Sequence, residues 1–306
     1  MFHKILVPLD GSEVAECVLP HVKALADGNE RVSIIFLYAV APLDIPLINI
    51  RYRNKILTDA KKAATSYLKK ILESSGLSDL AESKVIVGKA ADSIVDFAIK
   101  NKMDLIVMAT HGLSGVSRWL YGSVADKVVH ESPTPVWLIK AGSSQKAPYA
   151  TRQPLRILVP LDGSPVAESV LPYLKQVHLQ FQQYEQDIIL VRVCEIFSPP
   201  IGYPPPLSMS WEEYIDYEKN RCLDICRSYL QRVQRRLARN DIKVRIEVPE
   251  GNPAEALIDL INKNSINLVI LSTHGRTGFS RWAFGSVAEK VLKGANCPVL
   301  LARVKK

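Results

Sequence analysis

Short apolar runs alternate along the chain with longer segments in which apolar residues recur every three or four positions. The two halves begin with the apolar runs Ile5–Leu9 and Ile157–Leu161, and their longest periodic segments are Lys55–Ser74 and Glu212–Arg239. A short apolar run is typical of a buried strand, whereas a period of 3.6 residues is typical of an amphipathic helix. Strands that alternate with helices predict a parallel sheet with helices on both faces.

The same pattern predicts the other elements of each half. Further strands are expected at Val32–Val40, Lys84–Val87, Leu105–Ala109 and Val136–Lys140, and then at Asp187–Cys194, Lys243–Val248, Leu268–Ser272 and Val299–Arg303. Shorter helices are expected to begin near Val14, Ala91, Val166 and Ala254. The predicted fold class is therefore α/β, with two tandem doubly wound domains that each contain a five-stranded parallel sheet.

The chain contains an internal repeat. Lys4–Ser12 returns as Arg156–Ser164 with a single change, and Gly122-Ser123-Val124-Ala125 returns as Gly285-Ser286-Val287-Ala288. So many matches in the same order indicate duplication of one domain.

A polar segment without apolar periodicity separates the two copies. We predict a first domain over residues 1–142, a linker over 143–154 and a second domain over 155–306. The last strand of each copy would leave an exposed sheet edge, which is an aggregation hazard. We therefore expect the domains to pair through Val136–Lys140 and its counterpart, with a homodimer as a further possibility.

Charge and cysteine content narrow the class of protein. The net charge of +8 is spread evenly over both halves, which suits a small anionic ligand but does not predict nucleic-acid binding. Cys222 and Cys226 lie one helical turn apart, and core packing is the favoured interpretation over a metal site. No apolar run reaches the roughly 18 residues of a membrane span, and no leader pattern is found. We expect a cytoplasmic protein with reduced cysteines and no membrane partner.

Two motifs in each copy directly follow strands. Asp10-Gly11-Ser12 follows the first strand, and a glycine-containing segment follows the fourth. Ligands of open α/β sheets bind beyond the carboxyl ends of the strands, so both motifs should face one crevice. Ser123 and Ser286 precede amphipathic runs and are predicted N-caps, whose helices offer free N–H groups to a phosphate. The segments are neither Walker A nor Rossmann motifs, and simple turns remain the alternative.

As a whole, these segments resemble the universal stress protein family. Its nucleotide-binding members carry Gly-x₂-Gly-x₉-Gly-Ser/Thr after the fourth strand, and here Gly112 and Gly275 are each followed by nine residues and then Gly-Ser. The family's opening Val-Pro-x-Asp-Gly-Ser occurs in both copies, and its closing Cys-Pro-Val-Leu occurs at the end of the second. The first glycine of the motif is replaced by Ala109 and Ser272, both of which are small.

The resemblance implies a regulatory or stress-response protein that binds ATP or AMP, with or without Mg²⁺, and hydrolyses ATP at most weakly. It places Asp10 and Asp162 near ribose and phosphate, and it implies that the strand ends near Val40 and Cys194 meet adenine through backbone groups. The residues it implies as ligand contacts are Pro8, Asp10, Val40, Ala109, Gly112, Gly115, Gly122, Ser123 and Val124, and then Pro160, Asp162, Cys194, Ser272, Gly275, Arg276, Gly278, Gly285, Ser286 and Val287.

Other interpretations of the same residues remain open. His111 and His274 are either catalytic bases or, as favoured, partners that order a loop, and Arg118 and Arg281 either bind phosphate or lie on the surface. The aspartates are either ligand contacts or simple caps. An adenylate-forming enzyme is disfavoured because its Ser-Gly-Gly-x-Asp-Ser and His-x-Gly-His motifs are absent. A nucleotide-free interaction module remains the alternative.

The two copies are not expected to bind equally. The second domain has Ser272 and Arg276 where the first has Ala109 and Leu113. A hydroxyl and a permanent charge can both contact phosphate or ribose oxygens. We therefore expect the second domain to bind nucleotide more tightly.

Overall fold

The elements of the fold come from a computed structural model that describes residues 1–29, 31–43, 50–110, 123–141, 154–195, 210–273 and 285–303. The first half contains β1 Lys4–Pro8, α1 Glu13–Glu16, α2 Leu19–Ala26, β2 Ser33–Val40, α3 Ile50–Ser75, β3 Ala81–Val87, α4 Ala90–Lys100, β4 Leu105–Thr110, α5 Ser123–Glu131 and β5 Val136–Lys140. The second half contains β6 Leu155–Pro160, α6 Pro165–Glu168, α7 Leu171–Gln180, β7 Gln186–Val191, α8 Trp211–Ala238, β8 Arg245–Glu247, α9 Pro253–Lys263, β9 Leu268–Thr273, α10 Ser286–Gly294 and β10 Val299–Arg303.

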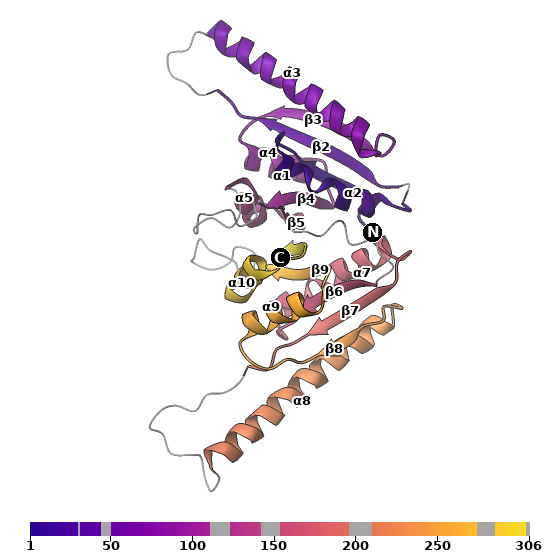
Figure 1. The fold of residues 1–306 in the computed structure, drawn as a ribbon, viewed down its shortest axis with the longest axis vertical. Helices are drawn as coiled ribbons and strands as arrows, with labels where there is room; N and C mark the ends of the chain where they lie inside the picture. The colour runs from indigo at the N-terminus through magenta and orange to yellow at the C-terminus, as the bar shows by residue number, and fades with distance from the viewer. Residues whose placement is uncertain are drawn as a thin grey trace.

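The strands of both halves form one continuous sheet. Their order is β3-β2-β1-β4-β5-β10-β9-β6-β7-β8, and all pairings within each half are parallel. At the centre β5 and β10 pair antiparallel, with Trp137 opposite Leu300. The predicted α/β class and the predicted pairing of the last strands are both confirmed. The long helices α3 and α8 therefore lie at opposite ends of the molecule (Figure 1).

Helices cover both faces of this sheet, and each face has its own buried core. One core packs strand side chains against α1, α2 and α3 and their counterparts α6, α7 and α8. The other packs the opposite strand faces against α4, α5, α9 and α10. Both cores extend across the centre of the sheet, where Trp137 lies 6.2 Å from Phe181 between ring centroids. The two domains thus share buried surface on both faces.

Polar contacts also join the domains at one end of α7. Gln180 is 1% exposed, and its side chain accepts a hydrogen bond from the Phe2 N–H at 2.9 Å and donates one to the Leu25 carbonyl. The Tyr184 hydroxyl donates to the Asp27 carboxylate at 2.7 Å. A buried amide that satisfies backbone groups of the other domain is costly to remove, because those groups would lose their partners.

We expect limited proteolysis near Ser143–Arg152, which lies outside the described residues, to cut the chain without separating it. The β5–β10 pairing, the shared cores and Gln180 should hold both fragments together after the cut. Size-exclusion chromatography without denaturant should give one peak that contains both fragments. Two peaks of half the mass would show that the central interface does not sustain the pair.

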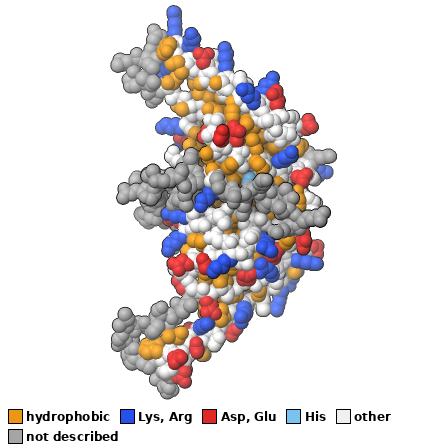
Figure 2. Space-filling model, viewed as in Figure 1, with side chains coloured by type: hydrophobic (Ala, Val, Ile, Leu, Met, Phe, Trp, Pro, Cys, Tyr) orange, Lys and Arg blue, Asp and Glu red, His pale blue; other side chains and the backbone are white. Residues whose placement is uncertain are grey.

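The surface of the molecule carries mixed charge. Figure 2 shows basic and acidic side chains interspersed over the described part of one face. None of the described helices is both long and apolar enough to cross a membrane.

Candidate functional site

The Asp-Gly-Ser segments form the same tight loop after β1 and after β6. In the second domain, Gly163 has a φ of 93°, in the left-handed region that favours glycine. Asp162 accepts a hydrogen bond from the Ser164 N–H at 2.8 Å, and the Ser164 hydroxyl caps α6. In the first domain, Asp10 accepts from the Ser12 N–H at 3.0 Å, and Ser12 caps α1. One oxygen of each aspartate therefore shapes the loop that carries it.

A cavity of about 680 Å³ lies beyond the ends of β6 and β9, where the strand order of the second domain reverses. Its volume is in the range of small-ligand sites, roughly 300–1,000 Å³. The predicted residues that line it are Pro160, Asp162, Ser272, Gly285, Ser286 and Val287. Two motifs more than a hundred residues apart in sequence thus meet at one site, as expected for this topology.

The glycine segment enters this cavity through the start of α10. Gly285 is the N-cap, with φ −61° and ψ 144°, and Ser286 is the first helical residue. The prediction that Ser286 is the N-cap is therefore wrong by one position, because Gly285 already holds the extended conformation that a cap requires. The first N–H groups of a helix have no partner within it and attract anions. Apart from its chain neighbours, no described residue has a heavy atom within 4 Å of a Cβ atom placed on Gly285, so the described part of the cavity is open there.

The first domain has a smaller version of this site. A cavity of about 200 Å³ beyond β1 and β4 is lined by Pro8, Asp10, Ala109, Ser123 and Val124 among the predicted residues. Ser123 is the first residue of α5 and not its N-cap, so the prediction for this serine is also wrong. The feature that the two sites share is the start of a helix, whose first backbone N–H groups have no partner within the helix.

At the strand ends predicted to meet adenine through backbone groups, the side chains around Val40 and Cys194 alternate between the core and the cavities. Val40 and Cys194 are buried and do not line the cavities, whereas Ala39, Val193 and Glu195 do. Side chains alternate along an extended chain, so the neighbours of a buried residue point to the opposite side. Cys194 is also bonded to Cys222, which lines the second cavity. Core packing is thus the wrong interpretation of Cys222, and the expectation of reduced cysteines is wrong for Cys194 and Cys222. Cys226 is buried as expected.

Arg192 is a cavity residue that the sequence analysis missed. Strand pairing places Val159 opposite Leu190 and Val7 opposite Phe36, so Arg192 occupies the position of Tyr38 in the first domain. Its guanidinium carbon lies 4.9 Å from the centroid of the Tyr229 ring. The second cavity therefore has a permanent positive charge where the first domain has a phenol. Aligning the two second strands would have revealed this difference.

A tyrosine holds each long helix against the first helix of its domain. The Tyr229 hydroxyl donates to Glu168 at 3.1 Å, and the Tyr67 hydroxyl donates to Glu16 at 3.0 Å. Burial, together with the nearby carboxylate, raises the pKa of Tyr229 well above its usual value. Both hydroxyls therefore stay protonated, and they fix the register of α3 and α8 beside the cavities.

The predicted residues that lie outside the described residues are His111, Gly112, Gly115, Arg118, Gly122, His274, Gly275, Arg276, Gly278 and Arg281. In the described part of the chain, no group of three or more His, Cys, Asp or Glu side chains is arranged to hold a metal ion.

Comparison with known proteins gives one family over both halves. The model of the "Universal stress protein family" matches residues 1–140 and 155–303. A universal stress protein of Mycolicibacterium smegmatis is 25% identical over 231 residues, which are 76% of this chain and 71% of that protein. One from Methanocaldococcus jannaschii is 29% identical over 151 residues, which are 49% of this chain and 83% of that protein. The crystal structure of a universal stress protein from Archaeoglobus fulgidus shares the fold, with a TM-score of 0.69 at 19% identity, over 98% of this chain and 97% of that one.

Proposed function

Because the chain belongs to the universal stress protein family, we propose that it is a regulatory protein that binds adenine nucleotide, ATP or AMP, and binds it most tightly in the second domain. The observation that carries the proposal is the meeting of Asp162, Ser272 and the start of α10 in one cavity of about 680 Å³. We further propose domains over residues 1–142 and 155–306, with 143–154 as linker.

The chemistry of the lining residues fits a nucleotide. The free N–H groups at Gly285 and Ser286 suit phosphate oxygens, since they combine unpaired donors with the positive end of the helix dipole. Asp162 at the loop after β6 suits ribose hydroxyls, which can donate to a carboxylate oxygen. Val193, Ile225 and Leu257 provide an apolar wall against which a base can pack.

The first domain is proposed to bind more weakly. Its cavity of about 200 Å³ is smaller than the roughly 300 Å³ at which ligand sites usually begin. It also has Tyr38 in place of Arg192, and the Tyr38 hydroxyl already donates to the Asp10 carbonyl at 3.1 Å. A titration of the whole chain with ATP should therefore resolve one tight site before any weaker one.

Arg192→Leu should weaken ATP binding at the tight site about tenfold, because a charge-assisted contact to phosphate contributes about 1.5 kcal/mol or more. The matched control is Arg232→Leu. Arg232 also lies over the Tyr229 ring, 5.9 Å from its centroid, but does not line the cavity. Isothermal titration calorimetry on both variants measures the effect.

Two results of this titration would count against the proposal. An equal loss of ATP affinity in Arg192→Leu and Arg232→Leu would show that Arg192 acts only through its contact with Tyr229 and does not contact the ligand. A wild-type chain that takes up neither ATP nor AMP would favour the alternative, a nucleotide-free interaction module of the same fold.

A further inference from the structure

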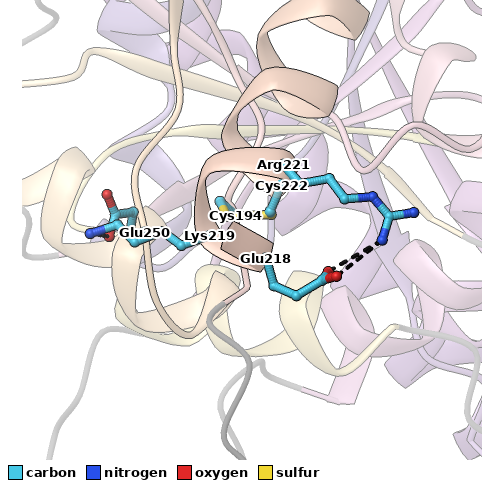
Figure 3. Close-up of a disulfide and its surroundings, with 6 residues drawn as sticks. All are labelled: Cys194, Glu218, Lys219, Arg221, Cys222 and Glu250. Carbon is cyan, nitrogen blue, oxygen red and sulfur yellow. Dashed lines mark hydrogen bonds and ion pairs between the residues drawn. A yellow bond between two sulfur atoms is a disulfide. The ribbon is translucent and has the colours of Figure 1, made fainter. Parts of the chain in front are cut away.

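A disulfide crosses from the end of β7 to the long helix α8. It joins Cys194 to Cys222 over a sequence separation of 28, with the two Cα atoms 5.8 Å apart (Figure 3). Cys194 is 1% exposed, and its backbone is fixed on both sides. Its N–H donates to the Pro249 carbonyl at 2.8 Å, and its own carbonyl accepts from the Gly251 N–H at 3.0 Å. Cys194 is thus a rigid anchor for whatever is bonded to it.

Cys222 lies on the wall of the second cavity, in the half of α8 that has no fully buried side chain. The buried residues of this helix all follow it in sequence: Cys226, Tyr229, Leu230, Val233 and Leu237. Before it, Lys219 pairs with Glu250 at 2.9 Å, on the opposite side of the helix from the Glu218–Arg221 pair (Figure 3). These side chains are partly exposed, and exposed pairs stabilise little. The disulfide is therefore the strong tie on this part of the wall.

The first domain lacks the pair. Tyr67 and Tyr229 make the same bond to equivalent glutamates, which aligns α3 with α8 and places Ala60 at the position of Cys222. Strand pairing places Val40 at the position of Cys194. Two domains of one fold thus differ in having, or not having, a covalent link between strand end and helix. The fold itself does not require the link.

We propose that Cys194 and Cys222 form a reversible thiol–disulfide site that reacts with soluble disulfides and thiols and controls the affinity of the second cavity for its ligand. This inference rests on the proposed function for the identity of that ligand. The oxidised chain holds the cavity wall in place, whereas the reduced chain frees the first turns of α8. If the wall must become ordered when the ligand binds, the free-energy cost of this ordering lowers the affinity.

The chemistry is a pair of thiol–disulfide exchanges. The Cys222 thiolate attacks one sulfur of a soluble disulfide RSSR and forms a mixed disulfide, releasing RS⁻. The Cys194 thiolate then attacks the Cys222 sulfur and releases the second RS⁻. Two protein thiols are oxidised to one disulfide, RSSR is reduced to two RSH, and these take the two protons that the cysteines gave up. Cys222 is the first to react because it is partly exposed at the cavity, whereas Cys194 is buried.

Cys226 is not the resolving thiol. It lies one helical turn from Cys222, but the structure bonds Cys222 to Cys194 and leaves Cys226 as a free thiol buried in the core.

The test compares the whole chain in reduced and oxidised glutathione. Alkylation and mass spectrometry should count five thiols after reduction and three after oxidation. Amide hydrogen exchange of residues 211–221 should be about tenfold faster in the reduced chain. The Kd of the reduced chain for ATP, measured by calorimetry, should be about fivefold higher than that of the oxidised chain.

The variant Cys194→Val/Cys222→Ala carries the residues of the first domain and should behave like the reduced chain in both buffers. Cys17→Ser, a free cysteine elsewhere, should switch like the wild type.

Each contrary result has a distinct meaning. Five thiols in both buffers, or equal exchange of residues 211–221, overturns the thiol–disulfide site itself. Changed exchange with an equal Kd for ATP overturns the control of affinity and leaves the proposed function intact. Changed exchange with no ATP bound in either buffer overturns the proposed function, and with it the ligand control. The wild-type measurements decide the matter even if the double variant does not fold.

Discussion

Replacing Gly285 with valine is expected to lower the affinity of the second domain for ATP roughly a hundredfold, since a lost charge-assisted hydrogen bond costs about 1.5–3 kcal/mol. Gly285 lines the cavity at the start of α10, and its Cβ position is open toward the described residues. An isopropyl group there would occupy the space that the phosphate needs to reach the helix N–H groups. Calorimetry with ATP on the whole chain measures the effect.

The valine should leave the fold intact. Gly285 has φ −61° and ψ 144°, a conformation that any residue adopts. Because glycine is a better N-cap than valine, the free energy of unfolding of Gly285→Val should fall by no more than about 1 kcal/mol. Ser286→Ala is the matched control: it removes an exposed hydroxyl but keeps the backbone N–H, so binding should change less than about threefold. A correctly folded Gly285→Val chain with wild-type affinity would show that phosphate does not bind at α10.

Trp137→Ala is expected to lower the free energy of unfolding by about 3–5 kcal/mol. Trp137 is fully buried in β5, opposite Leu300 of β10, and packs near Phe181 of the second domain. Its removal leaves a cavity at the place where the two domains share their core. Urea unfolding followed by far-ultraviolet circular dichroism gives the change.

The control removes a tryptophan outside the core. Trp211 is the first residue of α8, is partly exposed, and packs edge-on against Tyr214. Trp211→Ala should lower the free energy of unfolding by less than about 1 kcal/mol. Trp211 buries less surface than Trp137, and the residues around it can adjust to its removal. If both substitutions lower the free energy of unfolding by the same amount, the centre of the sheet is not a core that the two domains share.

Most of the fold could be predicted because the hydrophobic pattern is strong and repeated. The apolar run Leu105–Ala109 is β4 but for one residue, and the pairing of the last strands follows from the need to cover two sheet edges. The ends of elements were less accurate: α3 begins at Ile50, five residues before the predicted start. Periodicity locates the buried face of a helix, and the first turns of α3 have no buried face.

The site could be predicted in part. Asp162 and Gly285 were placed in one crevice from topology alone, and the structure brings them to one cavity. The cap was misplaced at Ser286 because a serine before an amphipathic run fits either the N-cap or the first helical position.

Composition and spacing do not predict the disulfide or the place of Arg192 on the cavity wall, although aligning the second strands of the two copies puts Arg192 at the position of Tyr38. Arg192 is one charged residue after a strand, and its place on the cavity wall depends on the pairing of β6 with β7. Cys194 and Cys222 are brought together by the packing of α8 on the sheet. Their separation in sequence carries no signature of a bond. Contacts of this kind are set by tertiary structure.

Native mass spectrometry of the whole chain with ATP or AMP tests the central claim most directly. The account predicts that a single nucleotide adds to the wild-type chain at low ligand concentration, and that Gly285→Val abolishes this addition. No nucleotide adduct on the wild-type chain at millimolar ATP or AMP would contradict it.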